Sequence, residues 1–160
     1  MKQRDTVSMP PDEVAMFLAA GRKLQLATLN PDGTPHLVSM FYAMRDGRIA
    51  FWTYRASQKA RNLARDPRIT CLIEDGEDYF ELRGVQIAGV VRTVEDVASV
   101  GRLVAGGMAG PSVRSGAVQG QSDGAAAEVI DDYVARAAAK RAAYVVEPQR
   151  VVSWDHRRLT

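Results

Sequence analysis

The segment Phe51–Leu63 combines residue types that could bind a phosphate group. Its first half is typical of a strand and its second half of a helix, with Ser57 placed as the helix N-cap. The N–H groups of Lys59 and Ala60 would then point outward at the positive end of the helix dipole, an arrangement that binds phosphate well. The hydroxyls of Thr53 and Ser57 add donors, and Lys59 adds a cation. The alternative is that Ser57 only caps the helix and Lys59 is a solvated surface residue.

Basic residues gather in this segment and just after it. Between residues 55 and 68 the only acidic side chain is Asp66, whereas the basic ones are Arg55, Lys59, Arg61, Arg65 and Arg68. The net charge of the whole chain is only +2, well short of the broad basic surface of a nucleic-acid-binding protein. We therefore expect a small anionic ligand and no nucleic acid. Arg61 and Arg65 could contact an anionic tail of that ligand, but an exposed helix face explains them better.

Cysteine and histidine are too few for common metal or thiol chemistry. The chain has one cysteine and two histidines, which cannot build a zinc site of the usual kind, so we expect no metal. Cys71 lies in the apolar run Ile69–Ile73, where a buried, unreactive thiol is expected. No apolar run is long enough to span a bilayer, and residues 1–20 do not form a signal segment. These features predict a cytoplasmic protein that does not bind membranes.

Turn residues divide the first part of the chain into short β-strands. Alternating apolar residues between turn signals predict strands at Lys23–Leu29, His36–Met44, Ile49–Tyr54, Arg68–Glu74 and Tyr79–Thr93. A helix at Pro10–Gly21 precedes them, and the helix Ser57–Arg65 is inserted between the third and the fourth. Gly84 and Gly89 stand where a curved barrel strand would bend. Because the hairpins leave no room for crossover connections, a parallel sheet is excluded.

The last third of the chain has a different composition. Residues 95–108 and 125–143 favour helices, and Gly110–Gly124, rich in Gly, Ser and Gln, is typical of a flexible loop. A closing strand is expected at Tyr144–Trp154. The sequence therefore predicts one domain over residues 1–160, mainly β with accessory helices (α+β). Its centre would be a six-stranded antiparallel barrel, with a variable helical insertion at about 95–143.

The order of these elements resembles the pyridoxamine-5'-phosphate-oxidase-like split β-barrel family, whose fold is FMN-binding-like. The likeness rests on Phe51–Leu63 within residues 23–93, and on the chain end around Ser153–Arg157. Lys59–Leu63 followed by Arg65–Arg68 is most similar to the actinobacterial branch that uses the deazaflavin coenzyme F420. The resemblance implies a homodimer with two cofactors between the subunits. The chain lacks a recognisable pyridoxal-phosphate site, so pyridoxine metabolism is not expected.

The resemblance also implies which residues hold the cofactor. These positions are Ser39, Met40, Tyr42, Thr53, Tyr54, Ser57, Gln58, Lys59, Tyr79 and Trp154. The first three lie, with Phe41, on the strand that faces the ring system, while Tyr79 reaches the cofactor from the second subunit and Trp154 closes the pocket. Successive side chains of a strand alternate faces, so at least one of Met40, Phe41 and Tyr42 belongs to the core. Tyr79 could instead be a solvated aromatic at the barrel end, and Trp154 could only bury area at the dimer interface.

The activity implied by the resemblance is that of an F420-dependent oxidoreductase, specifically a reductase. It would move hydride between the deazaflavin and a planar unsaturated or quinone-like small molecule. The cofactor carries the chemistry, so no side chain is assigned as catalytic. Three alternatives stay open: an FMN-dependent oxidoreductase on the same fold, a non-catalytic binder of F420, FMN or haem, and a structural dimer with a vestigial pocket. The sequence does not separate F420 from FMN, because one phosphate site would suit both.

Overall fold

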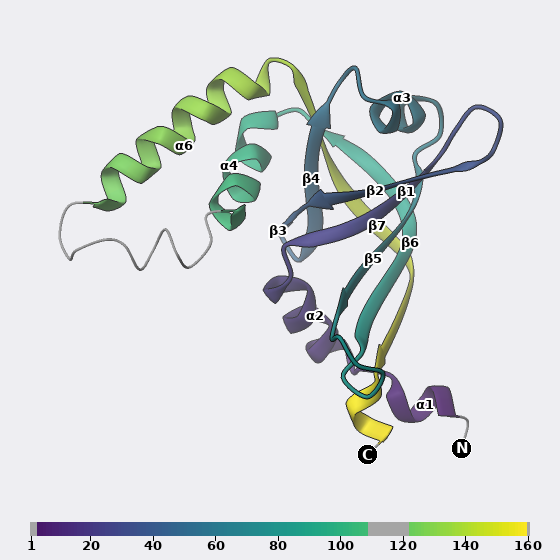
Figure 1. Ribbon diagram of the computed structural model, residues 1–160. Helices are drawn as coiled ribbons and strands as arrows, with labels where there is room; N and C mark the ends of the chain where they lie inside the picture. Colours follow the sequence, from purple (N-terminus) through teal and green to yellow (C-terminus); the bar gives the residue numbers. More distant parts are fainter. Residues whose placement is uncertain (1–2, 109–121, 160) are drawn as a thin grey trace.

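The computed structural model describes residues 3–108 and 122–159. The strands are β1 (Lys23–Leu29), β2 (Pro35–Phe41), β3 (Ala43–Arg45), β4 (Arg48–Tyr54), β5 (Arg68–Asp75), β6 (Arg83–Val94) and β7 (Arg141–Asp155). They form one seven-stranded sheet in the order β2-β1-β5-β6-β7-β4-β3. Every ladder between neighbouring strands is antiparallel. The sheet curls on itself into an incomplete barrel (Figure 1).

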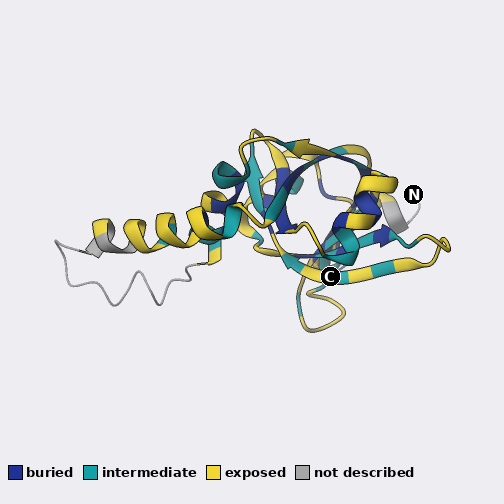
Figure 2. Ribbon diagram, turned by 90° about the horizontal axis from the view of Figure 1, so that it is seen from above, coloured by how far each residue is buried: buried dark blue, intermediate teal, exposed yellow. Residues whose placement is uncertain are grey.

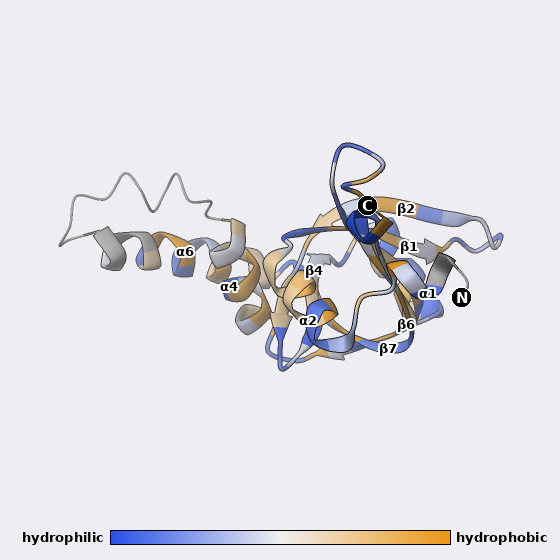
Figure 3. Ribbon diagram, turned by 90° about the horizontal axis from the view of Figure 1, so that it is seen from below, coloured by the Kyte–Doolittle hydropathy of each residue, from blue (hydrophilic) through white to orange (hydrophobic). Residues whose placement is uncertain are grey.

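The helices occupy three separate places around this barrel. They are α1 (Gln3–Val7), α2 (Pro11–Ala20), α3 (Gln58–Arg65), α4 (Val97–Met108), α6 (Ser122–Ala138) and the 3-10 helix η1 (His156–Leu159). The segments α1, α2 and η1 gather at one end of the barrel, and α3 lies at the other end (Figure 1). Figure 3 shows the molecule from below, toward the end that carries α1, α2 and η1, and both chain termini lie close together there. None of the described helices is long and apolar enough to cross a membrane.

The two edge strands of the sheet, β2 and β3, follow each other in the chain with Tyr42 alone between them. The sequence predicted one strand over His36–Met44 and six strands in all, which is wrong because this strand breaks at Tyr42. There the backbone N–H donates to the carbonyl of Arg22 at 2.9 Å, and the phenol donates to the carbonyl of Leu18 at 2.6 Å. The chain thereby changes its pairing partner from β1 to β4, which brings the two edges together.

The barrel interior holds the main apolar core. The fully buried large side chains Phe51, Leu24 and Leu26 lie in it, and Phe51 stacks on Tyr144 with ring centroids 5.3 Å apart. Cys71 is buried in the same core, and burial raises the pKa of its thiol to about 12. The predicted burial of this thiol is therefore confirmed.

A second apolar cluster lies outside the barrel, between β4 and the helices α4 and α6. Ala50 and Trp52 of β4 meet Val100 and Val104 of α4 and Val134 of α6. Because the side chains of a strand alternate faces, β4 buries Phe51 inward and Trp52 outward, and the strand is covered on both sides. Figure 2 shows that α6 extends beyond the barrel, with much of its surface exposed.

Strand β6 differs from its prediction at its beginning and matches it in its bend. It starts at Arg83 rather than at Tyr79, since Tyr79 lies in a turn in which the N–H of Glu81 donates to the carbonyl of Asp78 at 2.9 Å. The expected bend at Gly89 is confirmed by a register shift between Ala88 and Gly89 against β7. The predicted loop Gly110–Gly124 falls mostly on residues 109–121, outside the described residues, while residues 122–124 belong to α6.

Candidate functional site

The turn from β4 into α3 is built as the sequence predicts. Ser57 has extended backbone angles, and its Oγ accepts a hydrogen bond from the N–H of Ala60 at 3.3 Å, which confirms the N-cap. Thr53 Oγ1 lies 3.4 Å from Ser57 Oγ. The N–H of Ala60 is therefore used by the cap, and the expectation that it points free toward a ligand is wrong. Helix geometry leaves the N–H groups of Gln58 and Lys59 without intrahelical acceptors.

A buried amide holds α3 against β1. Asn62 is fully buried, and its Nδ2 donates to Thr28 Oγ1 and to Asn30 Oδ1, both at 3.0 Å. Its Oδ1 accepts from Gln58 Nε2 at 2.9 Å. The side-chain amide of Gln58, a predicted cofactor-site residue, thus supports Asn62, and its place in the cofactor site stays a prediction. Asn62 was missed from the sequence, although a polar residue on the buried face of a short amphipathic helix beside Leu63 is a recognisable signal.

A cluster of cations, formed by Arg55, Lys59 and Arg141, surrounds the start of α3. Arg55 Nε donates to the carbonyl of Arg141 at 2.8 Å. The Arg141 guanidinium lies 4.5 Å from the ring centroid of Trp52 and 4.2 Å from that of Tyr54. Burial, and then the nearby charge of Arg141, lower the pKa of Lys59. Within the described residues, no carboxylate forms an ion pair with any member of this cluster.

Hydroxyl donors and cations without an acid are the donor set that a phosphate ester requires. The Thr53 and Ser57 hydroxyls and the cluster of Arg55, Lys59 and Arg141 together supply that set. The residues present therefore fit a phosphorylated cofactor at this position. The sequence found Thr53, Ser57, Lys59 and the basic character of Arg55, but it did not single out Arg141, which lies at the far end of the helical segment.

Side chains of β2, the strand predicted to face the ring system, point alternately outward and toward the core, as strand geometry requires. Ser39 and Phe41 are exposed on the outer face of β2, whereas Met40 packs against the core. Tyr42 is buried in the barrel, where desolvation raises the pKa of its phenol above the ordinary value. As side chains, Met40 and Tyr42 thus belong to the core, and only their backbone is left to meet a ligand outside the barrel.

Tyr79 lies in the turn between β5 and β6, and Trp154 is next to the last residue of β7. The β5–β6 turn and the end of β7 lie at the end of the barrel that is distant from α3 (Figure 1). Tyr79 is 60% exposed, and its ring centroid is 4.6 Å from that of His156. His156 Nδ1 also hydrogen-bonds the Tyr79 carbonyl at 2.9 Å. The Trp154 ring covers Gly84 so closely that a side-chain Cβ on Gly84 would overlap it. One chain therefore does not bring these two residues to the cation cluster.

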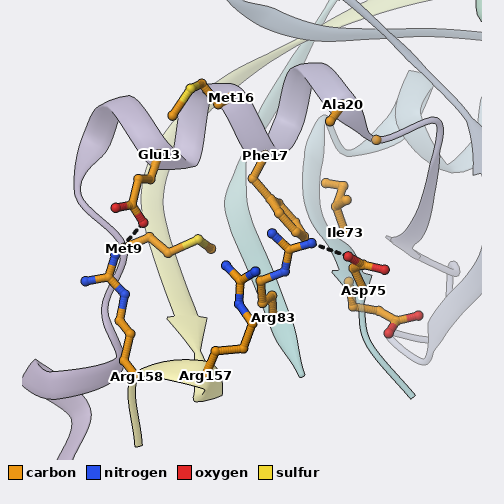
Figure 4. Close-up of a pocket in the computed structure, with 12 residues that line it drawn as sticks. Met9, Glu13, Met16, Phe17, Ala20, Ile73, Asp75, Arg83, Arg157 and Arg158 are labelled. Atoms are coloured by element: carbon orange, nitrogen blue, oxygen red, sulfur yellow. Dashed lines mark hydrogen bonds and ion pairs between the residues drawn. The ribbon is translucent and has the colours of Figure 1, made fainter. Parts of the chain in front are cut away.

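A cavity of about 710 Å³ lies at this same distant end, between α2 and the ends of β5 and β6. Figure 4 shows Phe17 and Met9 beside it, with arginines around its rim. Each rim arginine has an acidic partner: Arg83 pairs with Asp75, Arg158 with Glu13, and Arg157 with Asp155 at 2.6 Å. The cavity contains none of the sequence-predicted site residues. It was not predicted, because its walls come from three separate parts of the chain.

The curled antiparallel sheet, with α3 inserted after β4, defines a split barrel of the pyridoxamine 5'-phosphate oxidase type. The chain belongs to this family, whose model, described as pyridoxamine 5'-phosphate oxidase, matches residues 10–155. The family resemblance and the split-barrel fold that the sequence predicted are thereby confirmed. The comparison with curated proteins found no match.

Several solved structures are similar to this one. The conserved hypothetical protein Rv2991 from Mycobacterium tuberculosis is 38% identical, with a TM-score of 0.82 over 99% of this chain and 92% of that one. An F420 reductase is 23% identical, with a TM-score of 0.57 over 85% of this chain and 93% of that one. The haem storage protein HutZ from Vibrio cholerae is 20% identical, with a TM-score of 0.61 over 89% and 94%. At these lower identities, the last two show a shared fold.

Proposed function

We propose that the protein is an F420-dependent oxidoreductase that transfers hydride between the deazaflavin and a planar unsaturated or quinone-like small molecule. The observation that carries the proposal is the donor set around the start of α3. The Thr53 and Ser57 hydroxyls lie 3.4 Å apart, and Arg55, Lys59 and Arg141 have no acidic partner among the described residues. This is a donor set for a phosphorylated cofactor. An F420 reductase shares this fold, which is consistent with the deazaflavin as the phosphorylated cofactor.

The residues of this chain hold and shield the cofactor. Lys59, Ser57 and Thr53 would bind its phosphate, and Ser39 and Phe41, exposed on the outer face of β2, would face its ring system. When bound in its reduced form, the deazaflavin supplies a hydride from its ring carbon to the acceptor. The proton that completes the reduction comes from water. No side-chain acid is required, and the protein contributes position and exclusion of water.

We further propose that the functional unit is a homodimer. The outer face of the sheet exposes the apolar side chains of Leu37 and Phe41 on β2, which are 65% and 40% exposed. Leu72 of β5 lies on the same face, across Gln25 of β1. Apolar surface of this kind is stabilised when another surface covers it. A second copy that covers this face would bring Tyr79 and Trp154 of one subunit toward the cation cluster of the other. The separation of these groups within one chain would then be explained.

Titration of the purified apoprotein with F420 and with FMN, followed by cofactor fluorescence, tests the proposal. We expect micromolar or tighter binding of F420 and weak binding of FMN. Lys59→Ala should weaken F420 binding by about 1–3 kcal/mol, the scale of a lost charge-assisted hydrogen bond. The matched control is Arg61→Gln, which removes an exposed charge from the same helix. Equal losses of F420 affinity in Lys59→Ala and Arg61→Gln would show that binding follows net charge alone. Tight binding of FMN without binding of F420 would move the protein to the FMN-dependent class.

A non-catalytic binding protein is the second candidate, and the likeness of the fold to that of a haem storage protein favours it. The two candidates differ in turnover. Reduced F420 and a panel of quinones should give acceptor-dependent reoxidation of the cofactor if the protein is an oxidoreductase. Binding of F420 or haem without any such reoxidation would instead identify a carrier or storage protein.

A further inference from the structure

Arg141, the first residue of β7, is held by aromatic side chains on several sides. Its partner across the ladder is Tyr54, and the Tyr54 and Trp52 rings share the outer face of β4. The guanidinium carbon is 4.2 Å from the Tyr54 centroid and 4.5 Å from the Trp52 centroid. Tyr133 of α6 accepts from Arg141 Nη2 at 3.4 Å, and its ring meets Trp52 edge to face at 6.2 Å. We call Trp52, Tyr54 and Tyr133 the aromatic box.

The charge inside this box is not compensated. Arg141 Nε is buried and has no hydrogen-bond acceptor within residues 3–108 and 122–159. Arg55 donates a hydrogen bond to the Arg141 carbonyl, and Lys59 lies close enough for the Arg141 charge to lower its pKa. By contrast, each arginine around the large cavity has a carboxylate partner. Like charges that are packed together and partly desolvated destabilise the free protein, and an anion placed among them relieves that repulsion.

The box depends on the helical segment that separates β6 from β7. Gly101 of α4 lies against the Trp52 ring, where any Cβ would overlap it. Val134, beside Tyr133 on α6, is fully buried in the cluster that also contains Trp52. The helices α4 and α6 therefore determine where the Trp52 and Tyr133 rings lie, and through these rings where the guanidinium lies.

We infer that Arg141 is an anion-binding residue of the cofactor site, positioned by the aromatic box and thus by α4 and α6. Its ligand is the phosphate of the cofactor or a second anionic group next to that phosphate. This inference rests on the proposed function for the identity of the cofactor, but not for the presence of an anion site. It also assigns a role to α4 and α6, which orient the Arg141 guanidinium.

Binding measurements on Arg141 variants test the inference. Arg141→Gln should weaken F420 binding about tenfold or more, the effect of losing a charge-assisted hydrogen bond. Arg141→Lys should be intermediate, because lysine keeps the charge but lacks the planar group that stacks on the rings. Tyr133→Phe keeps the ring and should have a smaller effect. Arg136→Gln, which removes an exposed charge from α6, is the matched control and should bind as the original chain does.

Titration with inorganic pyrophosphate, followed by NMR of the lysine and arginine side chains, provides a readout that needs no cofactor. We expect saturable shifts at Lys59 and Arg141 that Arg141→Gln removes and Arg136→Gln retains. If pyrophosphate binds in this way and neither F420 nor FMN does, the inference stands and the proposed function fails. If F420 binds equally well to the original chain and to Arg141→Gln, the inference is wrong and the proposed function stands. Absence of any anion binding would overturn both.

Discussion

Ser57 can serve two purposes through one oxygen atom. Its Oγ accepts the hydrogen bond from Ala60 that caps α3, and it lies 3.4 Å from Thr53 Oγ1. A hydroxyl that accepts one hydrogen bond still has its own hydrogen to donate. Ser57 can therefore cap the start of α3 and also donate a hydrogen bond to a phosphate oxygen. This dual use explains why a residue typical of helix starts stands where the binding site is proposed.

The two uses of Ser57 can be separated by substitution. Ser57→Ala removes the cap and the donor, and it should cost about 1 kcal/mol of unfolding free energy together with cofactor affinity. Aspartate caps as well as serine, so Ser57→Asp should keep the stability while its charge repels the phosphate and abolishes binding. Urea unfolding and cofactor titration on both variants provide the check. Retained binding in Ser57→Asp would exclude an anion at this helix start.

Lys59 should make cofactor binding depend on pH. Its ammonium attracts the phosphate only while protonated, and burial together with the Arg141 charge lowers its pKa in the folded protein. Affinity should therefore fall as the pH rises through a value below the ordinary lysine pKa of about 10.4. In Arg141→Gln this midpoint should move upward, because one of the two causes is removed. The check is the F420 dissociation constant measured across the alkaline range, and an unchanged midpoint would contradict the expectation.

The lowered pKa of Lys59 also has a defined effect on stability. In the interval between its folded and unfolded pKa values, the unfolded chain holds this proton more often than the folded chain does. The contribution of Lys59 to the free energy of unfolding therefore rises with pH across that interval. For a lysine stabilised by a carboxylate, the contribution to the free energy of unfolding would instead fall as the pH rises.

At the scale of elements, β6 and β7 curve together through one irregular pairing. Ala88 pairs with Arg150 and Gly89 with Pro148, so that Gln149 has no partner across the ladder. Proline offers no N–H to a ladder, which is why a bulge is favoured at this point. A Cβ on Gly89 would overlap the backbone carbonyl of Glu147. The bend thus requires glycine on β6, because the two backbones approach too closely for a side chain.

Two glycine-to-alanine substitutions should have opposite effects on stability. Gly89→Ala forces the two strands apart and should lower the free energy of unfolding by about 1–3 kcal/mol, as overpacking does. Gly106→Ala, in α4, meets nothing within 4 Å. It should raise the free energy by about 0.5–1 kcal/mol, because alanine loses less backbone entropy than glycine in a helix. Denaturant unfolding of both variants tests this pair, and equal signs would contradict it.

At the scale of the whole molecule, the barrel presents two unlike ends and an apolar outer face. One end carries α3 and the cations Arg55, Lys59 and Arg141, which form no ion pair with any described residue, and the other carries the paired arginines of the large cavity. The apolar outer face between them is where we propose that a second copy binds. In the proposed assembly, the exposed Tyr79 of one subunit would complete the site of the other.

Charge placed on the outer face should therefore separate the subunits. Leu37→Glu should convert the dimer to a monomer and also weaken cofactor binding, because the partner's aromatic residues are lost. Val129→Glu is the control, since Val129 is equally exposed, at 69%, but lies on α6. Sedimentation velocity gives the oligomeric state of each variant. A Leu37→Glu variant that remains a dimer would place the interface elsewhere.

Local features of the chain were predictable, since each depends on residues a few positions apart. Between the strands predicted at His36–Met44 and Ile49–Tyr54, the chain turns at Asp46 and Gly47, and both residues have the positive φ values, 50° and 73°, that a tight hairpin needs. Ser57 predicted its cap, and alternation of apolar residues predicted β1 and β5. The family likeness followed from the same short motifs.

The features that were missed depend on contacts between distant parts of the chain. Arg141 meets Arg55 across 86 positions, and Asn62 meets Thr28 across 34. Tyr42 breaks a strand because Leu18 accepts its phenol, a contact that no alternation pattern contains. Side-chain period and turn chemistry act within a few residues, so the chain specified its elements locally. Burial, register and the position of each charge arise when those elements pack, so the site was complete only in the folded molecule.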